Sequence, residues 1–470
     1  MSGPIRTTLS VPAAGLAGSS FRGGGGPGAT RRRAVAWGGG GVLAALSAAC
    51  GGAAPGGEAG KPAISGPKEI TWSCYQSGEA RQKLWDDSFK MAAAATGVKI
   101  NVVWEPSQNY WDKRQTEAAA GSGGVDVMIN QLNWVVPGGL QGMFPDHYAL
   151  MRRDKLDTKE FYKADLESWA WKGKLWSMPM QSGGGVFLYN KAMFDAKGVK
   201  YPHKDWTYDE FLDACRKLND PANNKWAVQI GQNGIHYMLG TFLLNFGGKR
   251  LNDAKDKALY GDDPKSIQGA ELNVDIHRRF GFTPTPEAVA TVPTGKAPFD
   301  VEMVAMEING VFRHTNARAG IGAQNLDFAP PPKGPGGQTA SVAGNAWSIV
   351  QLSKNKDAAW KALKWIHTKE GMLAPQIKAV AWPPLIWAAD APQWKEQFAG
   401  SKIAEVSRVW ETGGHDLLVT PDAGDMWPLM GPTTPPLSAA FNGETSTKEA
   451  MSESARQVNE LFGRRPASWR

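Results

Sequence analysis

Apolar and polar residues alternate in blocks along the first folded part of the chain, and the blocks predict alternating strands and helices. Short runs rich in Val, Ile and Trp predict strands at 69–75, 98–105 and 125–130. The segments between them, 79–95 and 111–120, have the lengths and glycine stops of helices. This order and spacing favour a mostly parallel sheet with helices on both faces.

A second α/β region begins near residue 180, and no internal repeat is visible. Thr207 and Glu210 have the spacing of a capping box, in which each side chain accepts a hydrogen bond from the other residue's amide. The expected strands are 185–190, 225–231 and 303–308, and the expected helices are 235–246, 266–279 and 356–368.

Polar residues follow the predicted strands of the first region. Ligands of parallel sheets bind beyond the carboxyl ends of the strands. The residues at these ends are Tyr75, Gln76, Glu105, Asn130 and Gln131. They are therefore candidates for polar contacts with a ligand.

Residues 1–49 have the composition of an export signal. They include five arginines but no Lys, Asp or Glu, and a short apolar stretch follows Arg31–Arg33. A basic start, an apolar middle and small residues at the end are typical of a secretory signal. A membrane span requires about 20 apolar residues, more than this stretch provides. Thr30-Arg31-Arg32 resembles a twin-arginine signal, with ordinary secretion as the alternative.

The segment LSAAC, residues 46–50, resembles a bacterial lipobox. Cleavage before Cys50 would leave this cysteine at the new N-terminus, where it would carry the lipid. The alternative is a chance cysteine in a leader rich in Ala and Gly. Residues 51–67 form a Gly-rich tether with a span of roughly 20–25 Å. We therefore expect an exported protein, held by lipid on the outer face of the cytoplasmic membrane or free in the periplasm.

The leader accounts for most of the positive charge. The whole chain has a formal net charge of +7, but 47 basic and 45 acidic residues remain after residue 49, a net charge of +2. Nucleic acids and anionic membranes require a concentrated basic face, so neither is an expected partner. About 420 residues remain, enough for two or three domains.

Besides Cys50, the chain has two cysteines, Cys74 in the first strand and Cys215 on the apolar side of the helix after Thr207. We expect buried thiols, with a Cys74–Cys215 disulfide as the alternative in an oxidising compartment. Neither cysteine has CxxC spacing or a nearby histidine cluster, so we expect no metal site.

No catalytic motif is recognisable. HExxH, GxSxG and GxxxxGK[ST] are absent, and the seven histidines are scattered. We therefore expect a binding protein with no catalytic residue and no cofactor. A glycosidase or lyase remains an alternative, because the spacing of two carboxylates in space cannot be read from sequence.

Tryptophan is the most informative residue type. The chain has 20, of which 18 remain when Trp37 and Trp469 are left aside. Trp360 and Trp365 share a helix and are expected in the core. Others occur near Gly, Pro or Asn: Trp134, Trp347, Trp382 and Trp427. A ring in a loop can offer its face to the C–H side of a sugar, while neighbouring amides and carboxylates pair the hydroxyls.

Several segments resemble the extracellular sugar-binding proteins of bacterial ABC importers, solute-binding protein family 1, of the maltodextrin-binding kind. They are GKLWSMP, FLYNKAMFDAKGV, WTYDEFLDACRKL, VAMEINGVF and GNAWSIVQLSKNKDAAWKALKWIHTKEG. They run in the family's order, and the resemblance covers roughly residues 68–460.

The resemblance implies a type II periplasmic-binding-protein-like fold. Two α/β lobes, each built on a mainly parallel sheet, are joined by three hinge crossings with the ligand in the cleft. The expected division is a signal at 1–49, a tether at 50–67, lobe 1 at 68–179 and 331–378, and lobe 2 at 180–330 and 379–470. The implied partners are a carbohydrate and the ABC permease subunits in the membrane, and the expected state is a monomer that closes around its ligand and catalyses no reaction.

The resemblance and the loop positions together give a set of ligand-binding residues. The expected contacts are Tyr75, Gln76, Asn130, Gln131, Tyr237, Phe312, Asn345, Trp347, Trp382 and Trp427. Asn130 is polar where relatives can have an aromatic residue, so the identity of the sugar is left open. The alternatives are a secreted carbohydrate-active enzyme, or the same fold binding a polyamine, a peptide or a sugar phosphate.

Overall fold

The fold is described from a computed structural model, which divides the chain into two units, Met1–Ala63 and Ile64–Arg470. The description covers residues 69–76, 79–106, 109–122, 124–181, 183–231, 234–341, 344–380, 382–406 and 420–469. The export signal, Cys50 and the tether lie outside the described residues, so the expectations about them remain predictions. Everything below concerns the second unit.

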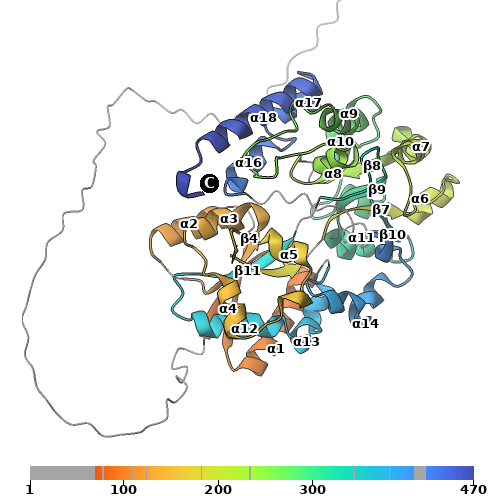
Figure 1. The fold of residues 1–470 in the computed structure, drawn as a ribbon. Coiled ribbons are helices and arrows are strands. Elements are labelled where there is room, and N and C mark those ends of the chain that lie inside the picture. Colours follow the sequence, from red (N-terminus) through yellow and green to blue (C-terminus); the bar gives the residue numbers. More distant parts are fainter. Residues whose placement is uncertain are drawn as a thin grey trace, which may run out of the picture. The chain divides into compact units, whose positions relative to one another are not determined.

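The first sheet, whose strand β11 is labelled in Figure 1, has five strands in the order β2-β1-β3-β11-β6. Its strands are β1 (Glu69–Tyr75), β2 (Lys99–Glu105), β3 (Val127–Gln131), β6 (Met178–Gln181) and β11 (Asn345–Ile349). Its helices include α1 (Glu79–Thr96), α2 (Tyr110–Ala119), α3 (Leu132–Leu140), α4 (His147–Arg153), α5 (Lys163–Ser168), α12 (Lys356–Ile366) and α13 (Lys369–Met372). A short hairpin, β4 (Ala170–Trp171) and β5 (Lys174–Leu175), precedes β6.

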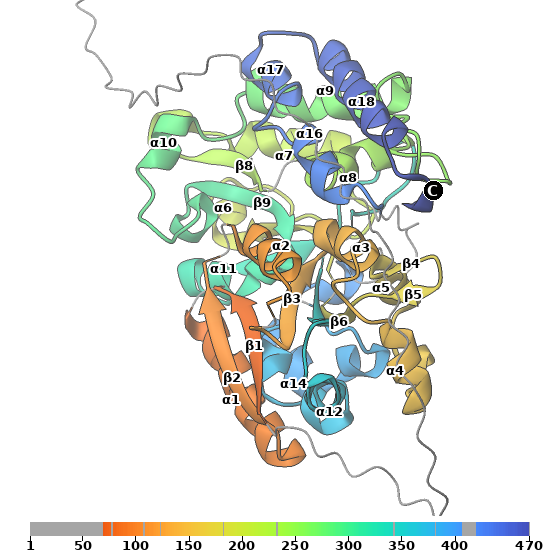
Figure 2. The same ribbon diagram turned by 90° about the vertical axis from the view of Figure 1, so that its left-hand side faces the viewer.

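The second sheet has four strands in the order β10-β7-β9-β8. They are β7 (Gly185–Asn190), β8 (Trp226–Ile230), β9 (Val304–Gly310) and β10 (Leu326–Ala329). Its helices include α6 (Lys191–Ala196), α7 (Tyr208–Leu218), α8 (Met238–Asn245), α9 (Pro264–Arg278), α10 (Pro286–Ala290) and α11 (His314–Ile321). Figure 2 shows β1 and β2 pointing with their carboxyl ends toward this part of the chain.

The last part of the chain is helical. It contains α14 (Pro392–Lys395), α16 (Ala423–Leu429), α17 (Leu437–Asn442) and α18 (Thr447–Gly463). Helices α17 and α18 pack on α9 of the second lobe, whereas α16 also contacts α3 of the first lobe. The two lobes therefore meet at α3 and α16.

Both sheets are mixed, which corrects the expectation of mainly parallel sheets. Strand β1 runs parallel to β2 and β3, but β11 runs antiparallel to β3 and β6. In the second sheet only β8 and β9 are parallel. The antiparallel strands β6, β7, β10 and β11 adjoin the crossings between lobes, so their direction is set by the route of the chain from one sheet to the other.

The strands and helices expected from the hydrophobic pattern are confirmed to within a few residues at their ends. The capping box at the start of α7 is also confirmed. The Thr207 amide donates to Glu210 Oε2 at 2.7 Å, and the Glu210 amide donates to Thr207 Oγ1 at 3.3 Å. The side chains of Thr207 and Glu210 thus fix the start of α7, as their spacing in the sequence predicts.

Among the described residues, the chain passes three times between the two lobes. The first leads from β6 to β7, and the second from β10 to β11. The third follows Leu385, which still pairs with Phe161 of the first lobe, and precedes Gln397, whose carbonyl accepts from Arg318 Nη1 of α11 at 2.8 Å. We therefore place this crossing later than the expected boundary at residue 379.

Cys74 and Cys215 are buried, free thiols in this structure, in different lobes. Burial raises the pKa of both thiols well above the usual value, so they are protonated at neutral pH. Over the described part of the chain, no helix has both the length and the hydrophobicity to cross a bilayer.

Candidate functional site

A cavity of about 320 Å³ lies where the two lobes meet. The first lobe contributes α2 and α3, and the second contributes residues 421–425 and Trp469. The lining residues are Asn109, Tyr110, Trp111, Asp112, Gln115, Asn133, Trp134, Pro137, Pro421, Gly424, Asp425 and Trp469. Its volume falls at the lower end of the range for small-molecule sites.

Three aromatic side chains, Tyr110, Trp111 and Trp134, form one side of the cavity and are called the aromatic wall below. The rings of Trp111 and Trp134 are stacked with centroids 5.5 Å apart and planes 4° apart. Tyr110 stacks on Trp134 with centroids 6.0 Å apart and an angle of 21°. Tyr110 is almost fully buried and Trp134 is half-buried, so the wall is anchored in the lobe and open toward the cavity.

Hydrogen-bonding groups surround the aromatic wall. Asp112 and Asp425, both exposed, contribute carboxylates from opposite lobes. Asn133 Oδ1 is buried and has no hydrogen-bond partner among the described residues. A buried acceptor left unpaired costs about 1–3 kcal/mol. A ligand hydroxyl donating to Asn133 Oδ1 would remove this cost.

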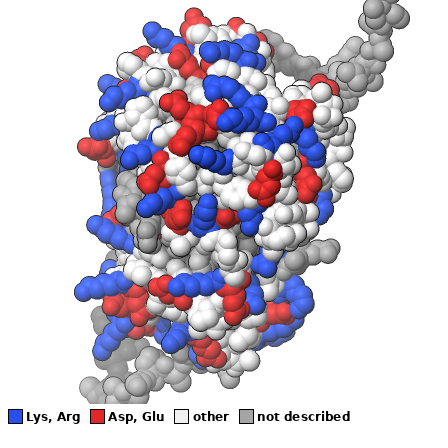
Figure 3. All heavy atoms as spheres, turned by 90° about the vertical axis from the view of Figure 1, so that its right-hand side faces the viewer, with Lys and Arg blue, Asp and Glu red and all other residues white. Residues whose placement is uncertain are grey.

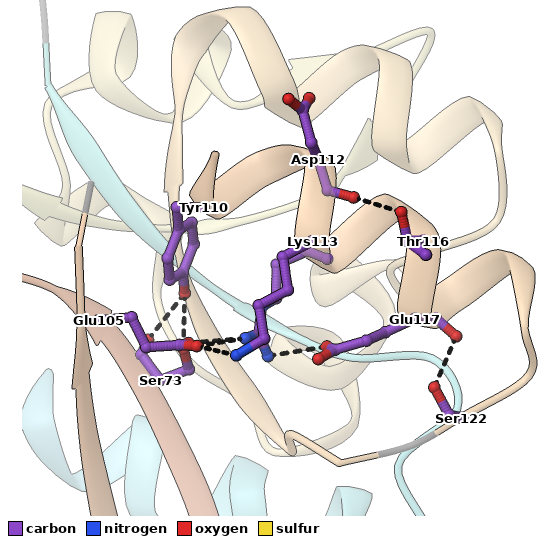
Figure 4. Close-up of polar contacts among 9 residues, drawn as sticks. Ser73, Glu105, Tyr110, Asp112, Lys113, Thr116, Glu117 and Ser122 are labelled. Atoms are coloured by element: carbon purple, nitrogen blue, oxygen red, sulfur yellow. Dashed lines mark hydrogen bonds and ion pairs between the residues drawn. The ribbon is translucent and has the colours of Figure 1, made fainter. Parts of the chain in front are cut away.

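A buried ionic network supports the aromatic wall from behind (Figure 4). Arg114, whose side chain is 4% exposed, donates through Nη2 to both Glu105 oxygens at 2.6 and 2.9 Å. Ser73 Oγ donates to Glu105 at 2.7 Å and lies 2.9 Å from Tyr110 Oη. The Arg114 guanidinium also lies 5.4 Å from the centre of the Tyr110 ring. The network therefore fixes the orientation of Tyr110.

The charge of Glu105 is stabilised in this network. Burial alone would raise the pKa of Glu105, but hydrogen bonds from Lys113 and Ser73 and the positive charge of Arg114 outweigh it and lower the pKa below the usual value. Glu105 is therefore a carboxylate at neutral pH and offsets the buried guanidinium.

Three of the expected contacts, Tyr75, Gln131 and Asn345, meet at one edge of the first sheet. Gln131 Nε2 donates to Tyr75 Oη at 3.2 Å, and Asn345 Nδ2 donates to the same oxygen at 2.5 Å. Gln181 Nε2 donates to Asn345 Oδ1 at 2.8 Å, and Arg81 donates to Gln181 Oε1 at 2.6 Å. This chain of polar groups, called the polar edge below, reaches the aromatic wall through an edge-on contact between Tyr75 and Tyr110.

Burial affects two ionisable groups of the polar edge. It raises the pKa of Tyr75 and lowers the pKa of Arg81 from their usual values. Tyr75 therefore stays a phenol at neutral pH, and its oxygen accepts hydrogen bonds from two amides.

Gln76 and Asn130 lie elsewhere than expected. Gln76 is exposed, and its backbone N–H donates to the Glu105 backbone carbonyl at 2.8 Å. Asn130 is fully buried, and its Nδ2 donates to Ser348 Oγ at 2.9 Å and Ser177 Oγ at 3.3 Å. Asn130 thus ties β3 to its neighbours within the lobe, and we leave it out of the proposed ligand contacts.

Tyr237 and Phe312 of the second lobe converge over Gly310. A Cβ atom at Gly310 would lie 2.7 Å from Tyr237 Oη and 2.2 Å from the Phe312 ring, so only glycine fits here. Tyr237 is 2% exposed, and burial raises its pKa. These two rings form a second aromatic cluster, at the end of β9.

Trp427 lies in α16, two residues beyond the cavity-lining Asp425. Its ring stacks on His236 with centroids 4.5 Å apart and planes 14° apart. Trp427 Nε1 and His236 Nδ1 are buried without hydrogen-bond partners among the described residues. Burial, together with the charge of Arg250, lowers the pKa of His236 to about 4, so the imidazole is neutral.

Trp347 and Trp382 are core residues in this structure, which corrects the expectation that their rings face a ligand. Trp347 is 1% exposed and makes edge contacts with Trp72 at 5.2 Å and Trp85 at 5.4 Å. Trp382 is 6% exposed and meets Trp394 edge-on at 4.5 Å. Neither ring has a free face, so both are left out of the proposed contacts.

None of the ten expected ligand contacts lines the cavity, and only Trp134 among the residues that do is singled out by the sequence. Asp112 and Asp425 resemble ordinary acidic residues in the first turns of helices, where the helix dipole favours them. Trp134 was noted as a loop tryptophan but lies in α3. The useful signal is the sequence NQLNW, residues 130–134, which spans the end of β3 and the start of α3 and so puts an amide and an indole together at the edge of the sheet.

The side chains that line the cavity can bind a small polar solute. Flat rings, amides and carboxylates match a solute with an apolar face and a rim of hydroxyls. Where the structure describes the chain, no three His, Cys, Asp or Glu side chains gather as a metal site requires.

Comparisons with known proteins agree with this picture. The erythritol/L-threitol-binding protein of Mycolicibacterium smegmatis is 25% identical over 328 residues, 64% of this chain and 67% of that protein. The maltotriose-binding protein of Pyrococcus abyssi is 23% identical over 333 residues, 68% of this chain and 66% of that protein. The match thus spans about two thirds of each of these curated relatives.

A solved structure supports the fold. An ABC substrate-binding protein from Listeria monocytogenes in complex with cycloalternan superposes with a TM-score of 0.74 at 19% identity, covering 84% of this chain and 99% of that one. The sequence model of the bacterial extracellular solute-binding proteins matches residues 75–373. Because this match extends over more than half of the chain, the protein belongs to the family of bacterial extracellular solute-binding proteins.

Proposed function

We propose that the protein captures a sugar or a related polyhydroxylated solute in the cavity between α3 and α16 and delivers it to an ABC permease. The aromatic wall, flanked by hydrogen-bonding groups from both lobes, is the observation that carries the proposal. The sugar, polyol and cycloalternan ligands in the names of the relatives support this class of solute.

The chemistry of a sugar fits the two kinds of surface in the cavity. The C–H face of a sugar ring can stack on Trp134, where apolar area is removed from water. Its hydroxyls can donate to Asn133 Oδ1 and to the carboxylates of Asp112 and Asp425. Hydrogen bonds to charged groups contribute about 1.5–3 kcal/mol each, so these contacts favour a hydroxylated ring over an apolar one of similar size.

Hinge closure follows from the position of the cavity. Its walls belong to both lobes, and a Cβ atom at Gly424 of α16 would lie 3.5 Å from the Asn133 carbonyl oxygen of α3. A solute that touches both walls stabilises the closed arrangement, because those contacts exist only when the lobes are together. The three crossings between the sheets would act as the hinge.

The expectations about export complete the proposal. Cleavage before Cys50 would give a lipid-anchored protein, and residues 50–67 would tether lobes built from 68–179 with 331–385 and from 180–330 with the rest. On the face shown in Figure 3, Lys and Arg side chains are interspersed with Asp and Glu. This face therefore carries no basic patch of the kind that binds nucleic acid, and the monomer beside its permease remains part of the proposal.

A thermal-shift screen tests the proposal. The panel contains erythritol, L-threitol, glucose and maltotriose, with spermidine, a tripeptide and glucose 6-phosphate as the alternative ligand classes. A ligand at 100 times its Kd adds about 2.7 kcal/mol of stability, which raises the melting temperature by several degrees. A shift with a neutral sugar or polyol supports the proposal. A shift with only the alternative classes, or chemical conversion of maltotriose on incubation, would contradict it.

A further inference from the structure

Trp469 lines two neighbouring cavities. It lines the cavity between α3 and α16, and it also lines a neighbouring cavity of about 890 Å³. The second cavity lies between the β4–β5 hairpin, represented by Trp171 and Lys172, and residues 252–257 with the end of α18. The half-buried Trp469 ring therefore forms a wall common to both spaces. Figures 1 and 2 show the end of the chain beside α18 and close to α3.

A buried ion pair holds the segment that carries Trp469. Arg465 follows α18 and donates through Nε to Asp422 Oδ2 at 2.8 Å and through Nη2 at 2.5 Å. The two side chains are 3% and 5% exposed. Arg465 Nη2 also donates to the Lys255 carbonyl at 3.0 Å, and the guanidinium lies 4.8 Å from the centre of the Phe462 ring. Arg465 is thus fixed by three separate contacts.

The same ion pair fixes the second-lobe wall of the ligand cavity. Asp422 lies within residues 421–425, which contribute Pro421, Gly424 and Asp425 to the lining. A buried charged pair of this kind resists separation, because removing either partner leaves an uncompensated charge. The Arg465–Asp422 pair therefore links the end of α18 to the wall of the cavity. Trp469 follows four residues later, and its backbone N–H donates to the Pro466 carbonyl at 2.9 Å, which keeps it close to this link.

We propose that Trp469 is a ligand-contacting residue that closes the side of the cavity facing the β4–β5 hairpin. The inference rests on the proposed function, because it assigns Trp469 to the same solute site. An indole at this boundary adds apolar area to a bound sugar ring and separates it from the water of the larger cavity. The chain thus supplies an aromatic contact from the segment after its last long helix.

Packing alone is the competing explanation. A ring that merely fills space between the lobes would contribute to the stability of the free protein and would leave affinity unchanged. A ring that contacts the ligand would contribute to affinity and little to the stability of the free protein. Since Trp469 is half-buried at the end of the described chain, its removal should leave the unfolding of the free protein nearly unchanged and weaken binding.

The test compares Trp469→Ala, Trp469→Phe and deletion of residues 466–470 with the matched control Trp387→Ala. Trp387 is also half-buried but lines neither of the two cavities. The Kd for the panel member that stabilises the wild type most is measured by calorimetry. We expect W469A and the deletion to raise this Kd about tenfold, W469F about threefold or less, and W387A not at all.

The outcomes separate the two proposals. A wild type that binds the sugar with W469A at the same Kd would overturn the assignment of Trp469 and leave the proposed function standing. A wild type that responds to none of the sugars and polyols would overturn the proposed function and this inference with it. A tenfold loss in W469A with an unchanged urea midpoint of the free protein supports the assignment.

Discussion

Replacing Trp134 by alanine removes the ring at the centre of the aromatic wall. The ring stacks on both Trp111 and Tyr110, and each aromatic pair contributes about 0.5–1.5 kcal/mol beyond the area it buries. From these two ring pairs alone, the free protein should lose about 1–3 kcal/mol of unfolding free energy. A bound sugar would lose its stacking surface as well, which for an anchoring aromatic residue costs about 2 kcal/mol. This corresponds to an increase in Kd of about 25-fold.

Isothermal titration calorimetry with the tightest-binding neutral sugar of the panel measures the loss of affinity, and urea unfolding measures the loss of stability. Trp104→Ala is the matched control. Trp104 is half-buried in β2, donates from Nε1 to Asp86 at 2.9 Å and does not line the cavity. W104A should lower stability and leave Kd at the wild-type value. The reasoning fails if W134A binds as tightly as W104A.

Three further predictions concern the first lobe. Trp347→Phe should lower the urea midpoint but leave the Kd unchanged, because Trp347 packs in the core. A tenfold higher Kd in a folded W347F protein would show instead that Trp347 contacts the ligand. Glu105→Gln should cost about 1.5–3 kcal/mol of unfolding free energy at pH 7, because Arg114 loses its hydrogen bonds to Glu105 and keeps only Glu117 as an ion-pair partner. The stability of the wild type should approach that of the mutant as the pH falls through the lowered pKa of Glu105, and parallel pH profiles would contradict this. Burial lowers the pKa of His147 to about 4, so between pH 6.5 and 4 this histidine is protonated in the unfolded chain but neutral in the folded protein. The free energy of unfolding should therefore fall by about 3 kcal/mol over that range, and by less in His147→Gln. Urea unfolding at each pH measures both.

The fold could be predicted where local patterns decide it. The run EITWSCY, the capping box at Thr207 and the apolar face of the helix beginning at Lys356 each specify an element without help from distant residues. Strand direction could not be predicted in this way. Strand β11 pairs with β3, which lies more than 200 residues earlier, so its antiparallel course depends on a crossing that the local sequence does not encode.

The polar edge beside the cavity could be predicted in part, whereas the lining of the cavity could not. The rule that ligands bind beyond strand ends drew attention to Tyr75 and Gln131, and the structure brings both together with Asn345. The same rule included Asn130, but successive residues of a strand point to opposite sides. Asn130 therefore faces Ser348 inside the lobe, and only Gln131 reaches the polar edge.

Tryptophan composition could not separate core from site. Trp347 and Trp134 both lie near Asn and Gly in the sequence, yet one is enclosed by Trp72 and Trp85 and the other borders the cavity. The difference depends on which elements pack around each ring. Trp469 and Asp425 belong to the site only because the last helices return to the first lobe, a long-range arrangement with no local signal.

A crystal structure of the protein with the panel sugar that binds most tightly tests the central claim most directly. The account predicts the sugar between the lobes, with its C–H face on Trp134 and its hydroxyls within hydrogen-bonding distance of Asn133 and Asp425. A sugar bound within a single lobe, away from α3 and α16, would contradict it.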